Sequence, residues 1–337
     1  MKRTFDQKLF DHLCEHIHFW NADAAGDAQL AGRVLQQREP SISEQGRSAF
    51  RQLKVVNWDA AHASRRLTSR PWQCDPFLYS LLQKLLLNKK ALVRVVQNSE
   101  VFRSWLHQNL KRRQEERISA KAIDFGYAAH RFNSMTKPLG RAVHNIFALV
   151  DTAMQITKSR SGHEAEACAD WLDHISTEGI VQLAMLADAA HESLKVTRFF
   201  DRETCPSECA SAELESYVTK ITYLFVAGRV VEHGFTVWVL NLLRTKPMLI
   251  FHRGKPKMLG GRNGVSGAIL EKCLARMRCW VRICLQVIDA EYPQYTLLSS
   301  FSVFNLVECA ITKEVLMEQN SKYKDSMFSQ LENCYLE

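Results

Sequence analysis

Two short acidic steps decide the expected fold of this chain: Ala22-Asp23-Ala24-Ala25-Gly26 and Trp58-Asp59-Ala60-Ala61-His62. Apolar stretches precede both steps, at residues 18–20 and 53–57, and small helix-compatible residues follow them. Open α/β sheets place catalytic and metal-binding groups where a strand ends and the chain turns into a helix. The pattern therefore predicts two strands, each leading into an aspartate at a helix start.

The composition is that of a folded protein with a small excess of positive charge. Hydrophobic residues make up 46% and charged residues 24% of the 337 residues, which is typical of a globular chain of one or two domains. The formal net charge of +8 leans toward polyanionic partners such as nucleic acid, although many proteins without such partners carry as much. No run of about 18 uncharged apolar residues occurs, and the first residues lack the apolar core of a secretory signal. We expect an intracellular protein, nuclear or cytoplasmic, with no membrane partner.

Beyond the second acidic step, the spacing of apolar residues is mostly helical. A helix over residues 60–68 should end at Pro71, because proline disrupts a helix interior. Residues 136–158 and 214–243 are each predicted to be helical, and a last long helix is expected from 268 to 292. The predicted fold class is mostly α with a small α/β part.

One segment of the helical body has a different pattern. The segments Met248-Leu-Ile-Phe251 and Lys257-Met-Leu259 flank a turn-like Arg-Gly-Lys-Pro sequence, which predicts a β-hairpin near 248–259. Residues 244–267 contain no acid and six cations: Arg244, Lys246, Arg253, Lys255, Lys257 and Arg262. We predict phosphate contacts here, whereas the basic run over residues 103–121 is typical of a solvated helix face. Clustering of the six cations with residues 111–113 would favour binding, and dispersal would favour a scaffold.

Further motifs lie between residues 124 and 134, a segment that includes Arg131-Phe132-Asn133-Ser134. Together with the two acidic steps, and in this order, they resemble the middle part of hAT-superfamily transposases over residues 18–245. The resemblance matches three family elements, namely the second catalytic aspartate, a C-x-x-H step and an R-W-x-S element. The matched positions are Asp23 for the first, Asp59 and His62 for the second, and Arg131, Phe132 and Ser134 for the third.

The resemblance implies an RNase-H-like sheet interrupted by a large helical insertion, in a DNA-binding, nuclear protein encoded by a transposable element or derived from one. In the family, acids at strand ends and a late glutamate hold two divalent metals, Mg²⁺ or Mn²⁺. Asp23 is the candidate remnant catalytic and metal-binding residue here, and Glu308 is a candidate for the closing acid. The family's first catalytic aspartate has no counterpart before Asp23. We therefore expect an incomplete sheet and no strand transfer. We expect no cofactor, unless the set of metal-binding acids proves complete, in which case Mg²⁺ or Mn²⁺ would bind. DNA is the implied partner, and family members commonly self-associate.

The same reasoning divides the chain into four parts. Residues 1–70 should form the partial RNase-H-like α/β portion, and residues 71–267 the helical insertion with its basic hairpin. Residues 268–320 are expected to return to the α/β portion, and residues 321–337 form a polar tail.

Each matched residue also has a plainer interpretation. Asp23 and Asp59 could be helix N-caps, which stabilise a helix by about 1 kcal/mol. His62 could be a structural histidine. Arg131 is a candidate nucleic-acid-binding residue, because its planar guanidinium group can bind phosphate, but it could equally pair with Asp124. For the whole chain, the alternative is a helical protein-interaction scaffold with no nucleic-acid role.

Overall fold

The computed structural model describes residues 19–22, 31, 55–113, 125, 135–202, 209–292, 317 and 321. Contacts between residues divide the chain into two compact units. Unit 1 comprises residues 1–66, 198–213 and 287–337, and unit 2 comprises residues 67–197 and 214–286.

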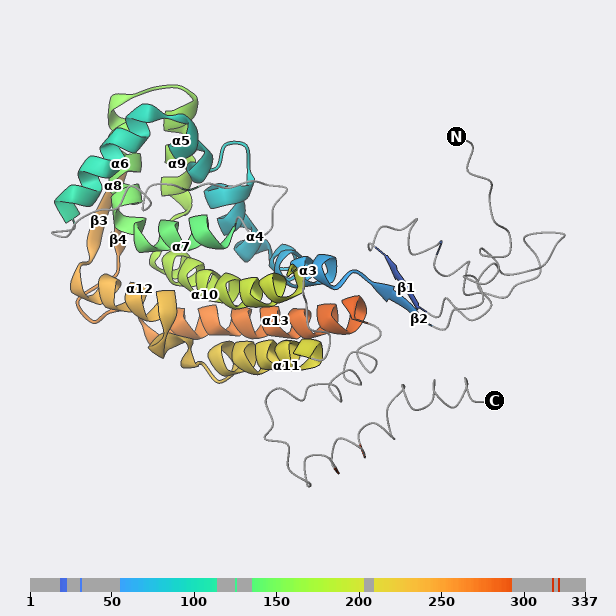
Figure 1. Ribbon diagram of the computed structural model, residues 1–337. Helices are drawn as coiled ribbons and strands as arrows, with labels where there is room; N and C mark the ends of the chain where they lie inside the picture. Colours follow the sequence, from blue (N-terminus) through green and yellow to red (C-terminus); the bar gives the residue numbers. More distant parts are fainter. Residues whose placement is uncertain are drawn as a thin grey trace, which may run out of the picture. The chain divides into compact units, whose positions relative to one another are not determined.

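The described chain is mostly helical, with two small β pairings (Figure 1). The strands are β1 (Phe19–Ala22), β2 (Val55–Trp58), β3 (Met248–His252) and β4 (Lys255–Leu259). The α-helices are α3 (Ala60–Gln73), α4 (Pro76–Leu82), α5 (Leu92–Asn98), α6 (Glu100–Arg113), α7 (Thr136–His144), α8 (Ile146–Ser159), α9 (His163–His174), α10 (Thr177–Phe200), α11 (Ala210–Ile221), α12 (Gly234–Thr245) and α13 (Gly267–Glu291). Thus the coarse fold class predicted from sequence, mostly α with a small β-containing part, is confirmed.

In unit 1, β1 and β2 pair in parallel, with Phe19 opposite Val55 and Ala22 opposite Trp58. The two strands predicted before the acidic steps are therefore present. Their carboxyl ends meet at one edge, and the chain passes directly from β2 through Asp59 into α3. A partly buried ion pair lies in the same unit, between Arg66 Nη1 and Glu291 Oε2 at 2.8 Å, and it ties the middle of α3 to the end of α13.

Pro71 does not end the first helix, contrary to the sequence prediction. The helix α3 runs through Pro71 to Gln73. A proline lacks the N–H group that would bond to the carbonyl four residues earlier, which here is the carbonyl of Leu67. The thiol of Cys284 lies 3.8 Å from that oxygen and can donate to it. Because α13 supplies a substitute donor, the helix continues past the proline.

The two long predicted helices are each interrupted. Residues 136–158 form α7 and α8, which change direction at Asn145. Residues 214–243 lie in α11, a π-helical turn, a short 3₁₀ turn and α12. The last break is at Gly234, where φ is +58° and a Cβ atom would lie 2.1 Å from a carboxylate oxygen of Asp188. That carboxylate accepts hydrogen bonds from the first turn of α12, so the break is required by the packing of Asp188 against the helix start.

The helices α10, α11 and α13 lie side by side in unit 2 (Figure 1). The buried hydroxyl of Tyr217 on α11 lies 3.1 Å from Ser193 Oγ on α10 and 3.9 Å from Cys284 Sγ on α13. Near the other end, Glu178 of α10 pairs with Lys272 and Arg276 of α13. These contacts hold the helical body to which the hairpin is attached.

Candidate nucleic-acid interface

Several residues singled out by sequence lie outside the described part of the chain. We therefore assign none of these residues to a site. They are Asp23, Arg131, Phe132, Ser134 and Glu308.

Asp59 follows β2 directly and occupies the N-cap position of α3. Its main-chain carbonyl accepts a hydrogen bond from the Ala63 N–H at 2.9 Å, the first bond of the helix. His62 lies within the first turn of α3. Among the described residues, no group of three His, Cys, Asp or Glu side chains is placed to hold a metal ion.

The strands β3 and β4 form the antiparallel hairpin that the sequence predicts. Arg253 and Gly254 form its two-residue turn, with φ values of +49° and +72°. Positive φ at both positions defines the type I′ turn, which matches the natural twist of the two strands. Glycine adopts this conformation without strain, whereas Arg253 needs a compensating contact.

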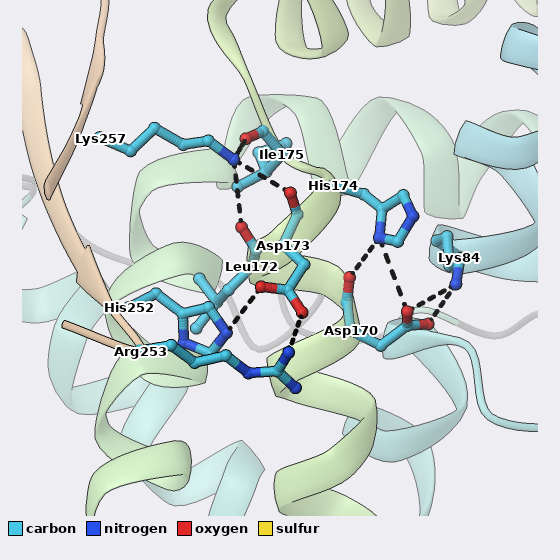
Figure 2. Close-up of polar contacts among 9 residues, drawn as sticks. All are labelled: Lys84, Asp170, Leu172, Asp173, His174, Ile175, His252, Arg253 and Lys257. Atoms are coloured by element: carbon cyan, nitrogen blue, oxygen red, sulfur yellow. Dashed lines mark hydrogen bonds and ion pairs between the residues drawn. The ribbon is translucent and has the colours of Figure 1, made fainter. Parts of the chain in front are cut away.

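Lys257 of β4 attaches the hairpin to the end of α9. Its ammonium group donates to the main-chain carbonyl oxygens of Leu172 (3.4 Å), Asp173 (3.1 Å) and Ile175, as Figure 2 shows. The last carbonyls of a helix lack partners within the helix, and a cation there also interacts favourably with the helix dipole. Burial lowers the pKa of Lys257 and the nearby Asp173 opposes this shift, so desolvation offsets part of the gain. All three ammonium donors are occupied, which leaves Lys257 out of any contact with a ligand.

The carboxylate of Asp173 provides the second attachment. One oxygen lies 3.1 Å from His252 Nε2 and the other lies 2.9 Å from Arg253 Nη1 (Figure 2). The Arg253 contact compensates the positive φ of the turn and neutralises that cation. The tip of the hairpin is thus held on α9 by an acid 80 residues earlier in the chain.

Four of the six predicted cations remain exposed and form no ion pair with any described residue. They are Arg244, Lys246, Lys255 and Arg262. Arg244 makes one hydrogen bond to a neutral group, in which its Nη2 donates to the amide oxygen of Asn241 at 3.2 Å. Lys255 lies beside the turn, and the other three lie at the opposite end of the hairpin. Residues 244–267 contain no acid, but Asp173 of α9 neutralises Arg253 at the turn, so the cations left unpaired by the described residues lie mainly at the end away from the turn.

The two faces of the hairpin differ sharply in exposure. On the inner face, Met248, Ile250 and Leu259 are at most 6% exposed. On the outer face, Leu249 is 45%, Phe251 54% and Met258 53% exposed. Among the described residues, this face is open to solvent and forms an apolar surface.

The basic run that begins at Arg103 is partly neutralised within the fold. Arg112 Nη2 lies 3.0 Å from a carboxylate oxygen of Asp151 on α8, and Arg113 Nε bonds to the same oxygen. Asp151 therefore neutralises part of the charge at the end of α6. Lys111 is exposed. Two of the hairpin cations and two cations of α6 are thus engaged within the fold, so the clustering that would favour binding over a scaffold is not shown.

Comparison with family models finds no match to the chain, and comparisons with curated proteins and with solved structures find none either. None of the described helices is long and apolar enough to cross a membrane.

Sequence reasoning found the hairpin cations but missed the apolar outer face. The run Met248-Leu249-Ile250-Phe251 has no alternation, which is typical of a strand buried on both faces. In the described structure only the inner residues are covered. The pairing register, which only the structure gives, places Leu249 opposite Met258 and Phe251 opposite Pro256 on the outer face.

Proposed function

We propose that this chain is a degenerate hAT-transposase-like protein that binds the nucleic-acid backbone through its basic hairpin and lacks strand-transfer activity. The proposal includes an RNase-H-like ancestry for the α/β part. Its support is the parallel pair β1–β2, in which each strand leads into one of the two acidic steps, followed by a helical body.

The observation that carries the binding proposal is the set of four exposed hairpin cations without an acidic partner among the described residues. Lysine and arginine side chains neutralise phosphates and release counterions, which makes such binding dependent on salt. We do not propose strand transfer. That reaction needs two divalent ions held by several converging carboxylates, and the positions that match the family provide too few.

A helical interaction scaffold is the second candidate function. The exposed apolar face around Phe251 favours it, since a contiguous apolar surface is typical of a protein contact. The two candidates differ in the ligand, so a binding experiment separates them.

The test is a fluorescence-anisotropy titration of a short labelled DNA duplex at several salt concentrations. Four phosphate contacts give a slope of about −3.6 in log K against log salt, or binding about 150-fold weaker at 200 mM than at 50 mM salt. A hairpin variant removes the four charges by substitution with glutamine at Arg244, Lys246, Lys255 and Arg262. It should lose most of the affinity and most of the slope.

A matched control variant removes four exposed cations elsewhere in the described chain. The control positions are Lys89, Arg103, Lys111 and Lys158. This variant has the same net charge as the hairpin variant and should bind much as the wild-type chain does. Equal losses in the two variants, or no binding by the wild-type chain at low salt, would contradict the proposal.

A further inference from the structure

The outer face of the hairpin is a continuous apolar strip. Residues opposite each other in an antiparallel pair point to the same side, so Leu249 and Met258 share a face with Phe251 and Pro256. The three large side chains of this strip are about half exposed. Of these three residues, Phe251 is nearest the turn, and it is 54% exposed.

This strip is held in a fixed position by the rest of unit 2. A two-stranded hairpin is marginally stable by itself. Here its inner face is buried, β3 packs against α8 and α9, and Lys257 and Asp173 fasten it to α9 (Figure 2). A ligand on the outer face would therefore meet a preformed surface, which lowers the entropic cost of binding.

The charges around the strip select an anionic occupant. Lys255 lies beside the turn, opposite His252 and therefore on the inner side of the hairpin, whereas Lys246 and Arg262 lie beyond the other ends of the two strands. No acid occurs in residues 244–267. An occupant that matches this surface combines apolar groups over the strip with negative charge at the end of the hairpin away from the turn.

We propose that the outer face of the hairpin binds single-stranded nucleic acid, with a base stacked on Phe251 and phosphates held by the exposed cations at the end away from the turn, Arg244, Lys246 and Arg262. This inference rests on the proposed function and names its ligand class. A single strand exposes both its base faces and its phosphates, and proteins bind it by combining aromatic platforms with a positive track. In a duplex the base faces are covered by their neighbours, so the apolar strip would have no partner.

The experiment compares single-stranded and duplex oligonucleotides of the same sequence in anisotropy titrations at one low salt concentration. The variants are Phe251→Ala, Phe251→Trp and a control, Tyr223→Ala, which removes an exposed aromatic ring of the π-helical turn. Loss of one stacked base should weaken single-strand binding by about 5- to 150-fold in Phe251→Ala. Duplex binding should change little, and both Phe251→Trp and Tyr223→Ala should retain single-strand binding.

Each outcome has a separate meaning. Duplex bound as tightly as single strand, with both insensitive to Phe251→Ala, would overturn this inference and leave the backbone-binding function in place. Failure of the wild-type chain to bind either oligonucleotide would overturn both. Competition with polyglutamate at equal charge concentration tests for an acidic polypeptide as the occupant. If it displaces the single strand as well as unlabelled oligonucleotide does, the inference is also wrong.

Discussion

The attachment of the hairpin by Lys257 makes a quantitative prediction for Lys257→Met. Methionine keeps most of the length and apolar stem of the side chain and removes the ammonium group. The carbonyls of Asp173 and Ile175 then lose a charged donor, and the contact to Leu172 is longer and weaker.

The magnitude follows from these contacts. Hydrogen bonds to charged groups contribute about 1.5–3 kcal/mol each, and a cation at a helix C-terminus adds about 0.3–1 kcal/mol. Burial lowers the pKa of Lys257, so the cost of desolvating the ammonium group cancels part of this sum. We expect a net loss of about 2 kcal/mol in the free energy of unfolding. In a domain of about 150–250 residues this corresponds to a fall in Tm of about 4–8 °C.

The assay is urea and thermal unfolding followed by circular dichroism, with Lys255→Met as the matched control. Lys255 lies on the same strand but is exposed and has no ion pair with a described residue, so its substitution should change the free energy of unfolding by less than about 0.5 kcal/mol. Amide hydrogen exchange should also increase at the end of α9 and in the hairpin of Lys257→Met alone. Equal stability of the two variants would refute the attachment.

Three further predictions concern carboxylates of the helical body. Asp188→Ala removes the acceptor of the Phe235 and Thr236 N–H groups and should cost about 2–4 kcal/mol in urea unfolding, with Asp188→Asn intermediate. Burial raises the pKa of Glu178, but hydrogen bonds from two cations of α13 outweigh this effect and leave the pKa below its usual value of 4.5. Its contribution to stability should therefore be complete above pH 4.5 and disappear as the pH falls through the lower folded pKa, and Glu178→Gln should flatten this acid limb of stability against pH. Asp151→Asn leaves two arginines of α6 without their shared partner and should cost about 1–2 kcal/mol in the same unfolding assay.

Each of these predictions has its own contrary result. Cooperative unfolding of Asp188→Ala at the wild-type urea midpoint would mean that α12 does not need this cap. Parallel acid limbs for the wild-type chain and Glu178→Gln would show that the ion pairs do not set the acid stability. A stability of Asp151→Asn equal to that of the wild-type chain would remove the proposed link between α6 and α8.

Local signals were enough to predict the elements that carry the proposed site. The Arg253-Gly254 turn lies between two apolar segments, and the acidic steps follow short apolar strands, so β1, β2 and the hairpin could be recognised from neighbouring residues. The continuation of α3 past Pro71 and the break before α12 at Gly234 were less predictable. They depend on a thiol from α13 and a carboxylate from α10, which are distant in sequence.

The state of each cation could not be predicted from the sequence for the same reason. Lys257 and Lys255 belong to one basic run. The ammonium group of Lys257 donates to three carbonyls of α9 and its C-cap, whereas Lys255 is exposed. Arg253 likewise has its partner on α9, at Asp173. Only the tertiary arrangement distinguishes cations that stabilise the fold from those available to a ligand.

The most direct test of nucleic-acid binding by the hairpin is photo-cross-linking of the full chain to a single-stranded oligonucleotide that carries a photoreactive base, with the cross-linked peptides identified by mass spectrometry. Cross-links should concentrate on the peptide containing Phe251 and should disappear in the variant that lacks the four exposed hairpin cations. Cross-links confined to other segments, or unchanged in that variant, would contradict the account.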